Sequence, residues 1–195
     1  MIELPPIFVM YCGPMFGTKS SKLLMELERF HYQKHPALVF KPLIDSRYST
    51  DEVVTHMGWR HPAVCVKQGA DVLEYLCTNE MNPWVVAVDE AFMIPGIADA
   101  LIFLYRSGFN VIVASLDLAA NGKPFPEVVK MLPWATRVEK CPAVCTVCGR
   151  DAFYTHKKVT GGDELTVEVG GDELYEPRCL HHHVLIDQRP KIDNS

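Results

Sequence analysis

The segment Gly-Pro-Met-Phe-Gly-Thr-Lys-Ser at positions 13–20 constrains the fold of this chain more than any other part of the sequence. It follows a short apolar run at residues 7–11 and leads into residues 19–34, where apolar side chains recur at helical spacing. A strand that passes through a glycine-containing loop into a helix presents backbone N–H groups to an anion. We therefore expect a phosphate-binding loop between the first strand and the first helix.

Two side chains of this loop suit a nucleoside triphosphate, since Lys19 has the reach to contact the β and γ phosphates and Ser20 supplies a hydroxyl for Mg²⁺. The second glycine is displaced by one position from the usual G-x-x-x-x-G-K-S/T pattern, so that Thr18 precedes the lysine. Thr18 must then adopt a backbone conformation that glycine tolerates more easily. The alternative is a Gly-Pro turn that only starts a helix. The loop residues expected to contact ATP and Mg²⁺ are Gly13, Pro14, Met15, Phe16, Gly17, Thr18, Lys19 and Ser20.

Apolar runs and helical patterns alternate after this loop. Residues 84–88 and 110–114 are nearly all apolar, as in strands buried on both faces of a parallel sheet. The expected strands are residues 7–11, 37–40, 84–88 and 110–114, with 61–66 as a further candidate. The expected helices are residues 19–34, 70–77 and 97–106. This alternation predicts an α/β fold with a doubly wound parallel sheet of the P-loop NTPase kind.

Asp89 and Glu90 directly follow the apolar run at residues 84–88. Open α/β sheets bind ligands at the carboxyl ends of their strands. In phosphate-loop NTPases an acid at this place holds the Mg²⁺ shell, and we assign that role to Asp89. Glu90 is then available to accept the proton of an attacking hydroxyl or to orient a water for hydrolysis. The plainer alternative is that both acids only cap the helix that follows.

Cysteines and histidines gather in the last third of the chain, where a C-x2-C pair is followed by a C-x2-H pair. Three cysteines and one histidine at such spacing are typical of a closed structural Zn²⁺ site in a zinc ribbon. The expected ligands are Cys145, Cys148, Cys179 and His182. The alternatives are Cys141 among the cysteines, His181 or His183 among the histidines, or cysteines that are only small core residues.

The sequence changes character after residue 140, because apolar runs shorten and two candidate strands, 152–158 and 165–169, flank a glycine-rich turn. We expect a P-loop ATP-binding domain at residues 1–140, a zinc-ribbon domain at 141–190 and a polar tail at 191–195. Acidic residues outnumber basic ones between the two Cys/His pairs. This charge balance disfavours the reading in which the zinc ribbon binds nucleic acid.

Composition excludes several classes of protein. With 195 residues and 48% hydrophobic content, the chain can bury a core, which argues against disorder and against a fibre. A formal charge of -5 offers no electrostatic footprint for a polynucleotide. No apolar run approaches the roughly 20 residues of a membrane span, and the N-terminus lacks the basic region of a secretory signal. We expect a cytoplasmic protein with no membrane partner.

Further motifs extend these features along the chain: GPMF at 13–16, KPLIDSRYS at 41–49, VDEA at 88–91, VASLD at 113–117, KPF at 123–125, and Gly170-Gly171 followed by Tyr175 and Cys179. Together they resemble the type II thymidine kinases of the cellular, poxviral and bacterial kind over residues 8–182. The resemblance implies an ATP-dependent kinase that transfers the γ-phosphate to the 5′-hydroxyl of thymidine in deoxynucleoside salvage. It also implies Mg²⁺, a structural Zn²⁺ and a homo-oligomer, commonly a tetramer.

The same resemblance assigns roles to individual residues. The acid that matches Glu90 deprotonates the 5′-hydroxyl in that family, and the segment that matches 165–175 is a lasso that closes over the base. Arg47, in the 41–49 motif, joins Asp89 and the loop in the ATP and Mg²⁺ site. The residues expected to bind the nucleoside are Met15, Phe92, Leu116, Phe125, Thr166, Val167, Glu168, Val169, Gly170 and Tyr175.

The chain departs from the family pattern near the base. Phe92 and Met93 stand where the family typically has glutamine and phenylalanine, and Ala120 stands where it has a phenylalanine that stacks near the base. Stacking on a base contributes roughly 1–3 kcal/mol in nucleic-acid systems. A loss of that size weakens thymidine binding or widens the choice of base. The alternative function is therefore a nucleotide-binding homologue with weakened catalysis, or a kinase with altered base preference.

Overall fold

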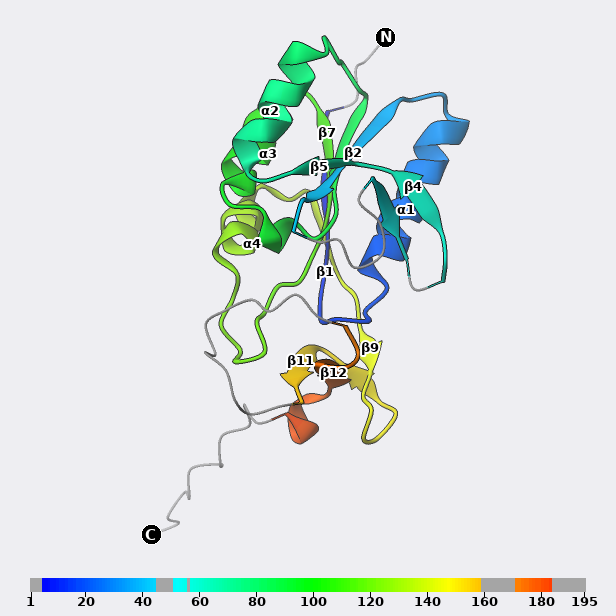
Figure 1. Cartoon of the computed structure of the whole chain (residues 1–195), viewed down its shortest axis with the longest axis vertical. Coiled ribbons are helices and arrows are strands. Elements are labelled where there is room, and N and C mark those ends of the chain that lie inside the picture. Colours follow the sequence, from blue (N-terminus) through cyan, green and yellow to red (C-terminus); the bar gives the residue numbers. More distant parts are fainter. Residues whose placement is uncertain (1–4, 45–50, 56, 159–170, 184–195) are drawn as a thin grey trace.

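The computed structural model describes residues 5–44, 51–55, 57–158 and 171–183. Its centre is a six-stranded sheet in the order β5-β2-β6-β7-β1-β8, in which every neighbouring pair runs parallel (Figure 1). The strands are β1 (Phe8–Cys12), β2 (Ala37–Pro42), β5 (Val64–Val66), β6 (Val85–Val88), β7 (Asn110–Ser115) and β8 (Arg137–Lys140). The predicted α/β fold with a parallel sheet is therefore confirmed.

Helices cover both faces of this sheet, because its central strands are apolar on both sides and must be shielded from water twice. On one face lies α1 (Lys19–Tyr32), whose Leu23 and Leu27 pack with Ile112 of β7. On the other face lie α2 (Gly69–Thr78), α3 (Ile97–Arg106) and α4 (Pro126–Met131) (Figure 1). The sheet is thus doubly wound, as predicted.

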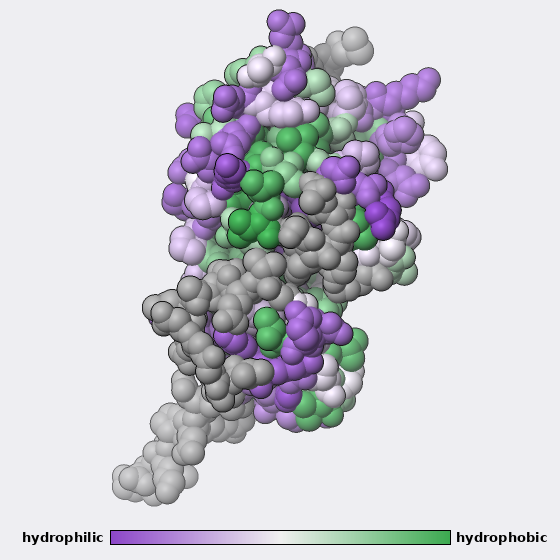
Figure 2. Space-filling model, viewed as in Figure 1, coloured by the Kyte–Doolittle hydropathy of each residue, from purple (hydrophilic) through white to green (hydrophobic). Residues whose placement is uncertain are grey.

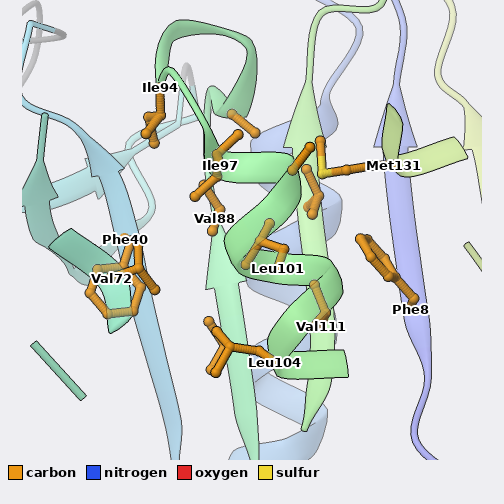
Figure 3. Packing of buried hydrophobic residues seen from close by; sticks show 14 of the residues in the cluster. Phe8, Phe40, Val72, Val88, Ile94, Ile97, Leu101, Leu104, Val111 and Met131 are labelled. Carbon is orange, nitrogen blue, oxygen red and sulfur yellow. The ribbon is translucent and has the colours of Figure 1, made fainter. Parts of the chain in front are cut away.

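The core on the α3 face is the larger of the two. Leu101 and Leu104 of α3 point toward the sheet between Val88 of β6, Val111 of β7 and Phe8 of β1 (Figure 3). The side chains of Leu101, Val88 and Val111 are completely buried. This packing fixes the strands against each other and so fixes where their carboxyl ends lie.

Smaller elements lie outside the main sheet. β3 (Glu52–Val54) and β4 (Arg60–Pro62) form an antiparallel hairpin. Two further antiparallel pairs join β9 (Ala143–Val144) to β10 (Asp151–Ala152) and β11 (Tyr154–Lys157) to β12 (Tyr175–Arg178). Short 3-10 helices are η1 (Ala91–Met93), η2 (Leu132–Trp134) and η3 (Leu180–His182). We call the described residues 141–158 and 171–183 the Cys/His module; it lies beyond the carboxyl end of β1 (Figure 1).

Some expected elements have different bounds. The candidate strand 61–66 is two strands, since β4 pairs with β3 in the hairpin while β5 joins the main sheet. The expected strand 84–88 begins at Val85, and the Trp84 ring stacks on His35, with centroids 4.4 Å apart. The candidate strand 152–158 divides between β10 and β11, and 165–169 lies outside the described residues.

The surface of the α/β body carries both hydrophilic and apolar residues. Figure 2 shows hydrophilic residues along its outer edges and apolar residues in the middle of the face in view. Within the described ranges, no helix has the length and apolarity needed to pass through a lipid bilayer.

Substitution of Leu101 by alanine is expected to lower the free energy of unfolding by about 2–5 kcal/mol, because it leaves a cavity between α3 and the sheet. Phe103→Ala on the same helix is the control, since that side chain is 60% exposed; its effect should stay within about 0.5 kcal/mol. Urea unfolding followed by circular dichroism measures both. Equal losses for the two variants would contradict this account of the core.

Candidate functional site

The expected phosphate loop spans the turn between β1 and α1 and packs against the backbone that follows β8. A Cβ added to Gly13 would lie 2.3 Å from the carbonyl oxygen of Cys141, and one added to Gly17 would lie 2.7 Å from the same atom. The N–H of Cys141 donates to the carbonyl of Cys12 at 2.7 Å. Both glycines are therefore required by the close approach of Cys141.

Thr18, which stands where the usual motif has glycine, adopts the left-handed backbone conformation that glycine tolerates more easily. Its φ of 56° and ψ of 19° are left-handed, and Phe16 has a φ of 64°. A positive φ is unfavourable for a β-branched residue. The loop is held there partly by α1, because the carbonyl of Thr18 accepts the N–H of Lys22 at 3.0 Å. The strain expected from the sequence is thus present at the start of α1.

Lys19 and Ser20 are already engaged at the loop. Lys19 is 7% exposed, and its Nζ donates to the carbonyl of Pro14 at 2.6 Å. Burial lowers the pKa of the Lys19 ammonium, while the negative charges of Glu90 and Asp89 oppose that shift. A phosphate placed in the loop would add negative charge beside a cation that water does not solvate, where the attraction is strong.

The loop and the acidic pair meet through one hydrogen bond. Ser20 Oγ donates to Asp89 Oδ1 at 2.8 Å, and Asp89 is 7% exposed. A hydroxyl and a carboxylate are the oxygen donors that Mg²⁺ takes in phosphate-loop sites. Asp89 is therefore not a solvated side chain, as the plainer alternative would have it.

Glu90 follows Asp89 with a left-handed backbone, at a φ of 50° and a ψ of 42°. An open pocket is lined by Glu90, Asp89 and loop residues 15–21 together with Lys41 and residues 53–55 of the β3–β4 hairpin. Glu90 therefore faces the same space as the phosphate loop. A carboxylate in such a place can accept a proton from a group bound in the pocket.

Among the described residues expected to bind the nucleoside, Met15 lines this pocket, whereas Phe92, Leu116, Phe125 and Tyr175 do not. Phe92 contacts Phe125, with ring centroids 4.6 Å apart and an interplanar angle of 44°. The N–H of Phe92 donates to Ser115 Oγ at 3.1 Å, which fixes η1 against the end of β7. Leu116, directly after β7, is 8% exposed. Tyr175 is partly buried at the start of β12.

Other expected residues lie outside the part of the chain that the structure describes. They are Arg47, Thr166, Val167, Glu168, Val169 and Gly170.

The Cys/His module brings the four expected metal ligands together. The Sγ atoms of Cys145, Cys148 and Cys179 and a ring nitrogen of His182 all lie within 4.8 Å of one another. Cys148 Sγ and Cys179 Sγ are 3.7 Å apart, and His182 Nδ1 lies 3.7 Å from Cys145 Sγ and 3.2 Å from Cys179 Sγ. Tetrahedral Zn²⁺ with Zn–S near 2.3 Å and Zn–N near 2.0 Å has ligand edges of roughly 3.5–3.8 Å, close to these separations. The donors present therefore fit a closed Zn²⁺ site.

One ligand of this group is prepared as a thiolate. Burial acts to raise the pKa of Cys145, but hydrogen bonds from the backbone N–H groups of Cys179, Val147 and Cys148 and from the His182 side chain lower it to about 5. A thiolate is the form of cysteine that binds metal.

The residues considered as alternative ligands lie elsewhere. Cys141 is buried beside the phosphate loop, where its Sγ lies 3.6 Å from the carbonyl of Glu139. His183 is 3% exposed, and its Nε2 donates to the carbonyl of Thr155 at 3.0 Å. The side chain of His181 is exposed. His182 is the histidine that joins the three cysteines.

Sequence reasoning missed two residues that shape this region. Lys41 is 4% exposed at the end of β2, lines the pocket and donates to the carbonyl of Glu52 at 3.3 Å. Its place after an apolar strand, at the same edge as Asp89, was the available signal. Thr155 Oγ1 accepts the N–H of Met15 at 3.0 Å, across 140 residues of sequence. No local pattern could have revealed that contact.

Comparisons with known proteins extend these observations. The model of the family described as thymidine kinase matches residues 7–183, a span that includes the phosphate loop, the acidic pair and the Cys/His group. Among solved structures, the genome packaging NTPase B204 from Sulfolobus turreted icosahedral virus 2, in complex with sulfate, is 17% identical. That likeness covers 66% of this chain and 72% of that chain, with a TM-score of 0.43.

Protein purified without chelator is expected to carry about one Zn²⁺ per chain, as a closed site with four ligands would. Cys148→Ser should lose the metal and lower the melting temperature, because such a site contributes folding energy. Cys141→Ser is the discriminating control and should keep the metal. Metal analysis of the three proteins measures this, and a metal-free Cys141→Ser protein would contradict the ligand set.

Proposed function

The chain belongs to the thymidine kinase family, and on that premise we propose that it transfers the γ-phosphate of ATP to the 5′-hydroxyl of thymidine. The hydrogen bond between Ser20 Oγ and Asp89 Oδ1 carries the proposal, because it joins the phosphate loop to the acidic pair in one pocket. The phosphate donor and the group that activates the acceptor then share one space.

ATP would bind along the phosphate loop. Backbone N–H groups and the start of α1 suit its phosphates, and Lys19 would exchange its bond to Pro14 for a phosphate oxygen. Ser20 and Asp89 would hold Mg²⁺, which neutralises charge on the β and γ phosphates when bound. Arg47 is proposed as a further contact to the phosphates.

Glu90 would act as the catalytic base. Its carboxylate accepts the proton of the 5′-hydroxyl as the hydroxyl oxygen forms a bond to the γ-phosphorus. The bond between that phosphorus and the oxygen bridging to the β-phosphate breaks, and ADP leaves. Glu90 lines the pocket beside Asp89. This position supports the role, because the catalytic base must lie close to the metal-bound phosphate.

The base of thymidine would lie against the apolar residues beyond Glu90. Met15, Leu116, Tyr175 and the contacting pair Phe92 and Phe125 are proposed to form this wall. The segment 165–175 is proposed to close over the base as the family's lasso does. The Phe92–Phe125 contact supports an aromatic surface in a chain that has alanine at position 120.

We also propose a domain division, an oligomeric state and a location for the protein. Residues 1–140 would form the ATP-binding kinase domain, 141–190 the zinc-ribbon and lasso domain, and 191–195 a tail. Family membership supports a homotetramer. A cytoplasmic location is proposed as well, because cysteines grouped for metal binding suit a reducing compartment.

A second candidate function is a nucleotide-binding protein with weakened turnover or an altered base preference. The left-handed Thr18 favours it, because this strained residue stands directly before the lysine of the phosphate loop. Under this candidate, ATP would raise the melting temperature, as any ligand selective for the folded state does. Phosphorylated thymidine would not accumulate, and assays with other deoxynucleosides would test base preference.

Glu90→Gln is expected to lower kcat for thymidine phosphorylation by about 10²-fold or more, because glutamine cannot accept the proton. The measurement is transfer of label from γ-labelled ATP to thymidine. Binding of ATP should persist in this variant.

The matched control is Glu80→Gln, which alters an exposed glutamate that also has a φ of 50°. Glu80→Gln should keep full kcat. It shows whether placing glutamine in a left-handed backbone conformation is harmful in itself, apart from losing the carboxylate in the pocket. Full kcat in Glu90→Gln would rule out Glu90 as the base, and absence of turnover in the unmodified protein would favour the second candidate.

A further inference from the structure

The phosphate loop contacts the Cys/His module at three points, although the two are far apart in the sequence. We propose that Phe16 and Thr155 are positioning residues through which the module holds the loop in its nucleotide-binding conformation. Metal loading of the module then sets the affinity for ATP. This inference rests on the proposed function, since it takes ATP as the ligand of the loop.

Phe16 supplies the apolar contact. Its side chain packs against the small core of the module, which consists of Ala143, Cys145, Ala152 and Cys179. Two members of that core, Cys145 and Cys179, belong to the metal-binding group. Phe16 thus joins a loop that lines the pocket directly to the residues that a metal would order.

Thr155 supplies the polar contact. The N–H of Met15, inside the loop, donates to Thr155 Oγ1 at 3.0 Å, and Thr155 is 3% exposed. The carbonyl of Thr155 in turn accepts Nε2 of His183, the residue after His182. The Met15 amide is therefore oriented by a buried hydroxyl whose strand is fixed next to the metal group.

The third contact is the close approach of Cys141 to Gly13 and Gly17. Cys141 stands between β8 and β9, where the chain leaves the sheet and enters the module. A displacement of the module would therefore move a carbonyl group that lies against both glycines. The module thus supports the loop through a hydrogen bond, an apolar contact and a backbone contact.

This support matters because the loop is strained. Phe16 and Thr18 both have positive φ, which costs free energy for residues other than glycine. Such conformations persist when the surroundings fix them. A metal that orders the module stabilises the strained loop, and by linkage a bound nucleotide should also favour the metal-loaded module.

The first test removes the hydroxyl alone. Thr155→Val keeps the shape of the side chain but leaves the Met15 amide without its acceptor, so the Kd for a fluorescent ATP analogue should rise about three- to tenfold. Thr155→Ser restores the hydroxyl and should bind within about twofold of the unmodified protein. Thr146→Val is the control within the module, because the Thr146 hydroxyl bonds to Glu176 and not to the loop.

Metal content is measured for each variant, because a merely unfolded module would lose zinc. The proposal expects a changed nucleotide Kd at full zinc content in Thr155→Val and an unchanged nucleotide Kd in Thr146→Val. An unchanged nucleotide Kd in Thr155→Val would overturn it.

The second test removes the metal. Chelation should weaken binding of the ATP analogue to the unmodified protein and have a smaller effect in Phe16→Leu combined with Thr155→Val, where the contacts are already reduced. Equal effects of chelation in both proteins would overturn the coupling while leaving the kinase proposal intact. Failure of the unmodified, zinc-loaded protein to bind the analogue at all would instead overturn the proposed function.

Discussion

Parallel pairing of the sheet strands is the constraint on which the rest of the structure depends. A parallel sheet must be buried on both faces, and all its carboxyl ends open at one edge. Each strand therefore delivers the residue that follows it to the same place: Gly13 after β1, Asp89 after β6, Leu116 after β7 and Cys141 after β8. Lys41, the penultimate residue of β2, lies at the same edge. The pocket is a consequence of topology before any side chain is considered.

The sequence predicted what is encoded locally. β1, α1, β6 and β7 are long apolar or periodic segments, and the α/β class follows from their alternation. The edge strand β8 escaped prediction because three of its four residues are exposed, which leaves no apolar run. Contacts such as Met15 to Thr155 escaped because they join segments across the fold. The spacing of the cysteines predicted their meeting because ligand geometry restricts spacing directly.

Backbone strain is concentrated around the pocket. Phe16, Thr18 and Glu90 all have positive φ, and they belong to the two turns that line it. Strained conformations of this kind persist where packing fixes them, and they cluster at functional sites. Here the packing is identifiable, since η1 is bonded to Ser115 and the loop is held by Cys141 and Thr155. The strain is thus supported from the sheet on one side and from the Cys/His module on the other.

The Cys/His module is too small to supply that support without help. Its own buried apolar core contains Ala143, Cys145, Ala152 and Cys179, far less than an independent fold requires. Modules of this size depend on a metal, and a closed set of four donors has no open position for catalysis. A metal bound at this site would influence a reaction in the pocket only by positioning the residues around it. The nearest such neighbour with a role in the pocket is the phosphate loop, because Phe16 completes the module's core.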